Sequence, residues 1–192
     1  MMDALLTEIE SQFVSLVPET LAEAEFESKL YAAFIPYFGW EMYADEQAEA
    51  NREIFLLTEE YYEQCELQHP NPGELGYHTY CWGEFINHCG ITQIQSESLQ
   101  ANLLKWYEHQ SDNDDCSRNA NYLRMIGGTL ANACQTLNKK EWDSRRFTED
   151  FVVFTDCMAD EAREYCIKQS TSAAWLEQQK SNGIFQTYYT VD

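Results

Sequence analysis

Basic residues are scarce in the first half of this 192-residue chain. Residues 1–104 contain 19 acidic residues but only two basic ones, Lys29 and Arg52, giving a formal charge of 2 − 19 = −17. Residues 105–192 contain 14 acidic and ten basic residues, or 10 − 14 = −4, and the whole chain carries −21. This imbalance repels phosphate groups, so we expect no direct binding to nucleic acid or to anionic membranes.

Paired cysteine motifs and long apolar runs are also missing. The seven cysteines are scattered without a CxxC pair, which disfavours a disulfide framework and favours thiols in a reducing compartment. The N-terminal segment MMDALLTEIESQF has no basic region, and no uncharged apolar run approaches the roughly 20 residues that cross a bilayer. We therefore expect a cytoplasmic protein with no membrane association.

The familiar catalytic signatures are absent as well. The sequence has no GxSxG, HExxH, Walker loop or GxGxxG motif, and only four histidines are available to exchange protons near neutral pH. We expect a protein that is not an enzyme and that needs no cofactor.

The apolar content of 44% is enough for a core, and we predict a single α+β domain over residues 1–192. Its sheet is expected to be small, mixed or antiparallel, and packed by several helices that make up most of the structure. Apolar spacing and turn residues predict helices at 2–17 (ending at Pro18), 44–67, from Ser96 or Ser98 to 109, 119–137, 158–169 and 171–181. Aromatic and β-branched runs predict strands at 29–38 (with Pro36 near an edge or bulge), 151–155 and 184–191.

Two groups of side chains have the donor types of metal ligands. His78, Cys81, His88 and Cys89 supply the nitrogen and sulfur atoms that zinc prefers, but the adjacent His88 and Cys89 do not fit a familiar zinc motif. Core cysteines with surface histidines are the favoured alternative. Asp112, Asp114 and Asp115 lack the glycine and the distal glutamate of a calcium-binding loop, so we expect a solvated acidic loop there and no bound metal.

A run of uncompensated carboxylates marks the predicted helix over 44–67. Glu59, Glu63 and Glu66 share one helical face, Glu60 lies beside them, and no Lys or Arg is near. Such a stripe is either a solvated face or a surface whose repulsion is relieved by a basic partner. Tyr61 and Tyr62 would give that surface its aromatic anchors. We predict a partner-binding site made of Glu59, Glu60, Tyr61, Tyr62, Glu63, Glu66, Asp112, Asp114 and Asp115.

The order of segments resembles that of a bacterial family, domain of unknown function 4303. The resemblance runs over residues 1–182 and is carried by LYAAFIPYF before ADEQAEANREIF, then YCWGEF before a helix, then RRFTEDFVVFTDCMADEAREYC. It implies an α+β domain of a kind found in part among the immunity genes of polymorphic-toxin systems. Cys81 precedes Trp82 where that family usually has a basic residue, so no pocket near Trp82 is carried over.

Three functional hypotheses follow. The first is an immunity protein whose acidic surface in residues 41–115 blocks a basic toxin, such as a nuclease. The second is a DNA mimic that occupies nucleic-acid-binding proteins. The third is a metal-dependent enzyme that uses the histidine and cysteine cluster. Charge and family resemblance both favour the first, and we expect its partner to be a basic protein, the cognate toxin.

Overall fold

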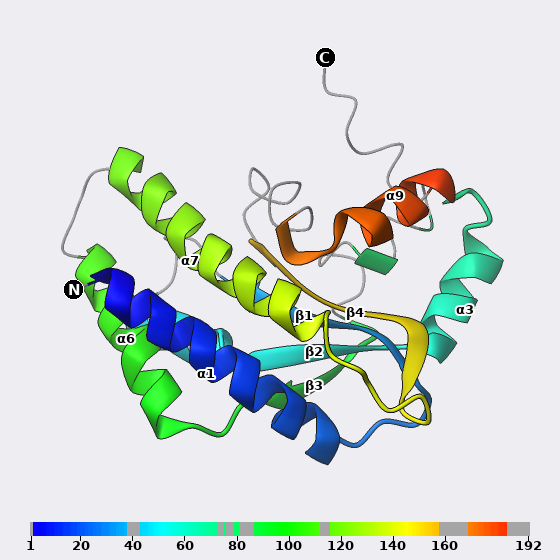
Figure 1. Ribbon diagram of the computed structural model, residues 1–192, viewed down its shortest axis with the longest axis horizontal. Helices are drawn as coiled ribbons and strands as arrows, with labels where there is room; N and C mark the ends of the chain where they lie inside the picture. The colour runs from blue at the N-terminus through cyan, green and yellow to red at the C-terminus, as the bar shows by residue number, and fades with distance from the viewer. Residues whose placement is uncertain are drawn as a thin grey trace.

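The architecture is one mixed four-stranded sheet with helices on both faces, as Figure 1 shows. The structure, a computed structural model, describes residues 2–37, 43–72, 75, 79–80, 87–111, 116–157 and 169–183. Its elements are α1 (Met2–Glu23), β1 (Leu30–Tyr37), α2 (Ala44–Ala50), β2 (Glu53–Thr58), α3 (Glu59–Gln68), β3 (Gly90–Gln93), α6 (Glu97–Ser111), α7 (Cys116–Leu137), β4 (Phe147–Cys157) and α9 (Ala173–Ser181). The predicted helix-majority α+β class is therefore confirmed.

The strands lie in the order β3-β2-β1-β4, and the sheet is mixed. β1 pairs antiparallel with β2 and parallel with β4, while β3 pairs antiparallel with β2. The predicted strand 151–155 is confirmed as part of the longer β4. All eight residues of β1 are buried, as expected for an internal strand covered on both faces.

Side chains alternate between two cores, one on each face of the sheet. Ala33, Ile35, Ile54, Leu56 and Val153 point toward α1, α6 and α7. The second core lies on the opposite face and also contains Tyr80 and side chains of α3 and α9. Its strand members are Tyr31, Ala32, Phe34, Phe55, Leu57, Val152 and Phe154, with Tyr31 at the register shift of β1. This period of two fixes which helices share a face, and it places α3 on the face opposite α1.

Pro18 does not end the first helix as predicted. α1 continues to Glu23 with Pro18 inside it, and both Val17 and Leu21 are fully buried. A proline in a helix interior costs about 3 kcal/mol, whereas burying Leu21 contributes about 1.5–3 kcal/mol and the hydrogen bonds of Arg146 to the carbonyls of the last turn add to it. Packing therefore outweighs the local signal.

The predicted helix over 44–67 is also wrong. It divides into α2, a turn at Asn51 and Arg52, the strand β2, and then α3. Ile54 and Leu57, whose spacing of three would put them on one side of a helix, instead face opposite sides of the sheet. The segment EIFLLT is apolar on both faces, which suits an internal strand, and pairing with β1 and β3 overrides its helix propensity.

Pro36 lies neither in an edge strand nor at a bulge. β1 is internal, and its register shift falls between Leu30 and Ala32. The paired register with β2 ends at Phe34 and Phe55, so Pro36, which has no N–H to donate, lies beyond it. The carbonyl of Pro36 instead accepts from the buried Asn51 side chain, whose oxygen accepts from Tyr107.

The helices predicted from Ser96 or Ser98 to 109 and over 119–137 are confirmed as α6 and α7. α6 is capped by Ser96, whose Oγ accepts from the backbone N–H of Leu99 at 3.2 Å, and Leu99, Leu103 and Trp106 are fully buried. In α7, Gly127 lies against the ring of Tyr37 in β1, since an added Cβ there would come within 2.7 Å of the Tyr37 hydroxyl. The predicted helix 171–181 corresponds to α9, whereas most of 158–169 and all of 184–191 lie outside the described residues. No described helix is long and apolar enough to span a bilayer.

Candidate functional site

Local capping starts α3 directly at the end of β2. The Oγ1 of Thr58 accepts from the backbone N–H of Tyr61 at 3.3 Å, and the backbone N–H of Glu60 donates to Ser28 Oγ at 3.3 Å. Glu59 and Glu60 stand in the first turn, where negative charge is favourable at the positive end of the helix dipole. The strand, the cap and the helix thus present the acidic run in a fixed orientation.

The inner side of α3 rests on aromatic side chains of the second core. Tyr62 meets Tyr31 edge to face with ring centroids 5.1 Å apart, and Tyr31 meets Tyr80 at 5.9 Å. Tyr61 stacks on His88 at 5.4 Å, and Cys65 is buried below the helix. Tyr61 and Tyr62 are half-buried and serve this packing, so they offer a partner only part of their surface.

The phenol groups of this layer resist ionisation. Burial raises the pKa of Tyr31 well above its ordinary value, with smaller contributions from Tyr80 and Tyr61. The pKa of Tyr62 is also raised, first by burial and then by the carboxylates of Glu66 and Asp150. These tyrosines therefore remain neutral around pH 7 and act as packing and hydrogen-bonding groups.

The outer side of α3 carries the carboxylates and one apolar side chain. Glu60, Glu63 and Glu66 are exposed, and Leu67 is 84% exposed. Within the described part of the chain, the ion pairs are Arg52–Glu49, Arg145–Asp143 and Lys180–Glu177, none of which involves α3. We call Glu59, Glu60, Glu63, Glu66 and Leu67 the α3 face.

The two bases of residues 1–104 differ in their relation to this surface, because Arg52 is paired elsewhere and Lys29 lies at its N-terminal end. The side chain of Arg52 is only 8% exposed and pairs with Glu49, so its positive charge is neutralised within the fold. Glu49 also accepts from Gln93 at 2.6 Å, and these two donors lower the pKa of its carboxyl group. Lys29 is exposed, and it stands beside the start of α3, since its carbonyl accepts from the Glu59 N–H at 2.7 Å.

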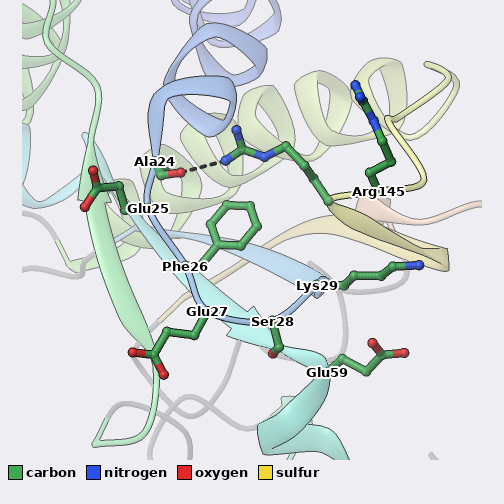
Figure 2. A pocket seen from close by; sticks show the side chains of 9 residues that line it. Ala24, Glu25, Phe26, Glu27, Ser28, Lys29, Glu59 and Arg145 are labelled. Atoms are coloured by element: carbon green, nitrogen blue, oxygen red, sulfur yellow. Dashed lines mark hydrogen bonds between the residues drawn. The ribbon is translucent and has the colours of Figure 1, made fainter.

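An open polar groove of about 640 Å³ adjoins the N-terminal end of the α3 face (Figure 2). Glu59 belongs to both surfaces, and Glu25 and Glu27 add exposed carboxylates to the groove. On the other side, Arg146 donates to the carbonyls of Leu21, Ala22 and Ala24 at 2.6–3.1 Å and lies 4.6 Å from the centre of the Phe26 ring. The groove therefore mixes both signs of charge, whereas the charged side chains of the α3 face are all acidic.

The histidine and cysteine cluster is only partly within the described residues. His88 is exposed and Cys89 is half-buried against the second core, which agrees with the packing alternative for this pair; His78 and Cys81 lie outside. Burial raises the pKa of Cys89 to about 11, so this thiol stays protonated near neutral pH. Over the described ranges, no three His, Cys, Asp or Glu side chains are grouped to hold a metal ion.

The acidic loop of the predicted site cannot be placed next to α3. Asp112, Asp114 and Asp115 lie outside the described residues, which resume at Cys116 in α7. The structure thus brings together Glu59, Glu60, Tyr61, Tyr62, Glu63 and Glu66 on α3, with the tyrosines turned inward.

Leu67 is the member of this surface that the sequence pattern did not single out. It follows Glu63 by four residues and Glu60 by seven, which is the spacing of one exposed helical stripe. The signal is present in the sequence, but it is visible only once Tyr61, Tyr62 and Cys65 are known to define the buried side.

Comparisons with known proteins add no relative: no family model, no curated protein and no solved structure matches this chain. The resemblance to domain of unknown function 4303 therefore stays a prediction.

Proposed function

We propose that this chain is a non-catalytic acidic binding protein of the immunity type, which acts in the cytoplasm by occluding a basic toxin. The proposal is supported chiefly by the α3 face, whose carboxylates form no ion pair with a described residue and of which Glu60, Glu63 and Glu66 are exposed. A basic partner relieves their mutual repulsion on binding.

The charge distribution of the chain also supports a basic partner, because it attracts positively charged proteins before contact is made. Arg52 is internally paired, so the exposed surface of residues 1–104 has few positive charges to offset its 19 acidic residues. A field of one sign speeds the encounter with an oppositely charged protein by roughly tenfold to a thousandfold. Fast capture is what an inhibitor needs when its target is harmful.

Affinity purification from a lysate of the native host, at low and at moderate salt, tests the proposal. We expect one basic protein to be retained at moderate salt and its toxic activity to be lost in the complex. A salt-sensitive spread of nucleic-acid-binding proteins would favour DNA mimicry instead. Retention of no basic protein at either salt concentration would contradict both.

A further inference from the structure

We propose that Leu67 is the apolar anchor of the α3 face, and that the partner contributes an apolar side chain flanked by Lys or Arg. This inference rests on the proposed function, because it takes the partner to be basic. It adds the chemistry that separates one selective protein partner from any cationic surface.

The first support is the position of Leu67 among the carboxylates. Its side chain is 84% exposed and belongs to neither core, although Cys65, two residues earlier, is buried. Glu63 lies one turn before Leu67 on the same stripe, and Glu66 is adjacent in sequence. An apolar centre with a charged rim is the usual anatomy of a protein interface.

The second support is the rigid layer beneath the helix. Tyr62, Tyr31 and Tyr80 form a chain of edge-to-face contacts, and Tyr80 reaches Trp175 of α9 with ring centroids 5.8 Å apart. The hydroxyl of Tyr31 donates to the carbonyl of Thr79 at 2.8 Å. Because α3 is held in this way, a partner that binds its outer side does not have to order it first.

The third support is the open setting of α3 in the molecule. Figure 1 shows α3 at the end of the long axis opposite α6 and the N-terminus, and its packed side faces β1 and β2. Charge complementarity then decides the occupant. Carboxylates around Leu67 favour Lys and Arg around the incoming apolar group and disfavour an acidic or purely apolar surface.

Two synthetic peptides of equal length and equal lysine content serve as probes. One is an amphipathic helix of Leu and Lys, and the other has every Leu replaced by Ser, so that only the charge is shared. Their affinities are measured by titration calorimetry at moderate salt against the full chain, Leu67→Ala and Ile91→Ala. Ile91 is the matched control because it is also exposed, at 55%, but lies in β3.

We expect the full chain to bind the Leu/Lys peptide about tenfold more tightly than the Ser/Lys peptide, and Leu67→Ala to lose that preference. Ile91→Ala should behave like the unchanged chain. If Leu67→Ala kept the preference, or if Ile91→Ala removed it equally, the anchor would be refuted while binding of the Ser/Lys peptide still supported a basic partner. Failure of both peptides to bind would instead count against the proposed function.

Discussion

Single polar side chains protect the exposed edge of the sheet. Asn138, just after α7, bonds both the N–H and the carbonyl of Val153 in β4, at 2.7 and 2.8 Å, and also reaches the carbonyl of Ser170. Ser170 in turn meets the backbone of Thr155, two residues further along the same edge. β4 is the outer strand, so these contacts occupy groups that would otherwise be open to pairing with another chain.

Replacing Asn138 with Ala should therefore destabilise the fold. The change leaves the N–H and the carbonyl of Val153 without these partners, and we expect a loss of about 2–3 kcal/mol in the free energy of unfolding. Urea denaturation followed by circular dichroism measures it. Asn132→Ala, at an exposed position of α7, is the control and should change little. Equal midpoints for the two variants would refute the role of Asn138.

The adjacent glycines of α7 should respond in opposite directions to alanine. A Cβ on Gly127 would lie 2.7 Å from the hydroxyl of the buried Tyr37, whereas one on Gly128 would meet nothing within 4 Å. We expect Gly127→Ala to cost about 1–3 kcal/mol through overpacking and Gly128→Ala to stabilise by about 0.5–1 kcal/mol through helix propensity. Thermal unfolding of the two variants checks the sign, and a stabilised Gly127→Ala would contradict the close contact.

At the scale of elements, α1 is completed by a residue far away in sequence. Its last turn has no basic side chain, and the guanidinium of Arg146 supplies the hydrogen bonds to the carbonyls at its C-terminal end. The backbone N–H of Leu30 donates to the Arg146 carbonyl at 2.9 Å, so the same residue ties the start of β1 to the approach to β4. Helix end and sheet are thereby linked through one residue, the helix by its guanidinium and the strand by its backbone carbonyl.

Arg146→Ala is expected to lower the free energy of unfolding by about 2 kcal/mol, because the carbonyls lose a charged donor. The neighbouring Arg145→Ala is a matched control. Its guanidinium is 87% exposed and pairs with Asp143, and it is expected to leave the midpoint of urea unfolding unchanged. A similar midpoint shift in both variants would show that charge, rather than capping, is what matters.

Local pattern predicted the elements whose signal is strong and whose neighbours agree with it. α6 has its serine cap and its apolar spacing, and β4 has a β-branched and aromatic run. The prediction of a single helix over 44–67 is wrong because it rests on local propensity alone. The residues of this segment form good helices locally, and only pairing with β1 and β3 makes 53–58 a strand. Long-range pairing is not encoded in any short window.

At the scale of the whole molecule, the main unbalanced force is repulsion among carboxylates. The net charge of −21 is concentrated in residues 1–104, and α3 adds a group of carboxylates that form no ion pair with a described residue. Glu60, Glu63 and Glu66, which the sequence placed in the binding site, are exposed, and their role in binding stays a prediction. The sequence could not predict which side of α3 faces outward, because that depends on the sheet beneath it.

Salt should therefore stabilise the isolated protein. Raising the ionic strength from about 0.01 M to about 0.15 M shortens the screening length from about 30 Å to about 8 Å, which weakens repulsion between separated carboxylates. We expect the melting temperature to rise over this range, with sodium chloride and potassium chloride acting alike. A melting temperature that fell with salt would show that attractive ion pairs dominate instead.

The most direct test of the central claim compares two charge reversals of equal size, one on the α3 face and one on α1. Glu63→Lys with Glu66→Lys changes the α3 face beyond its first turn, where lysine does not oppose the helix dipole. Glu8→Lys with Glu19→Lys alters the net charge equally, but on α1, which packs on the other face of the sheet. Titration calorimetry against the basic protein retained at moderate salt should show at least a tenfold loss of affinity for the α3 variant and a much smaller loss for the α1 variant. Equal losses in the two variants would contradict the claim that the α3 face is the binding site.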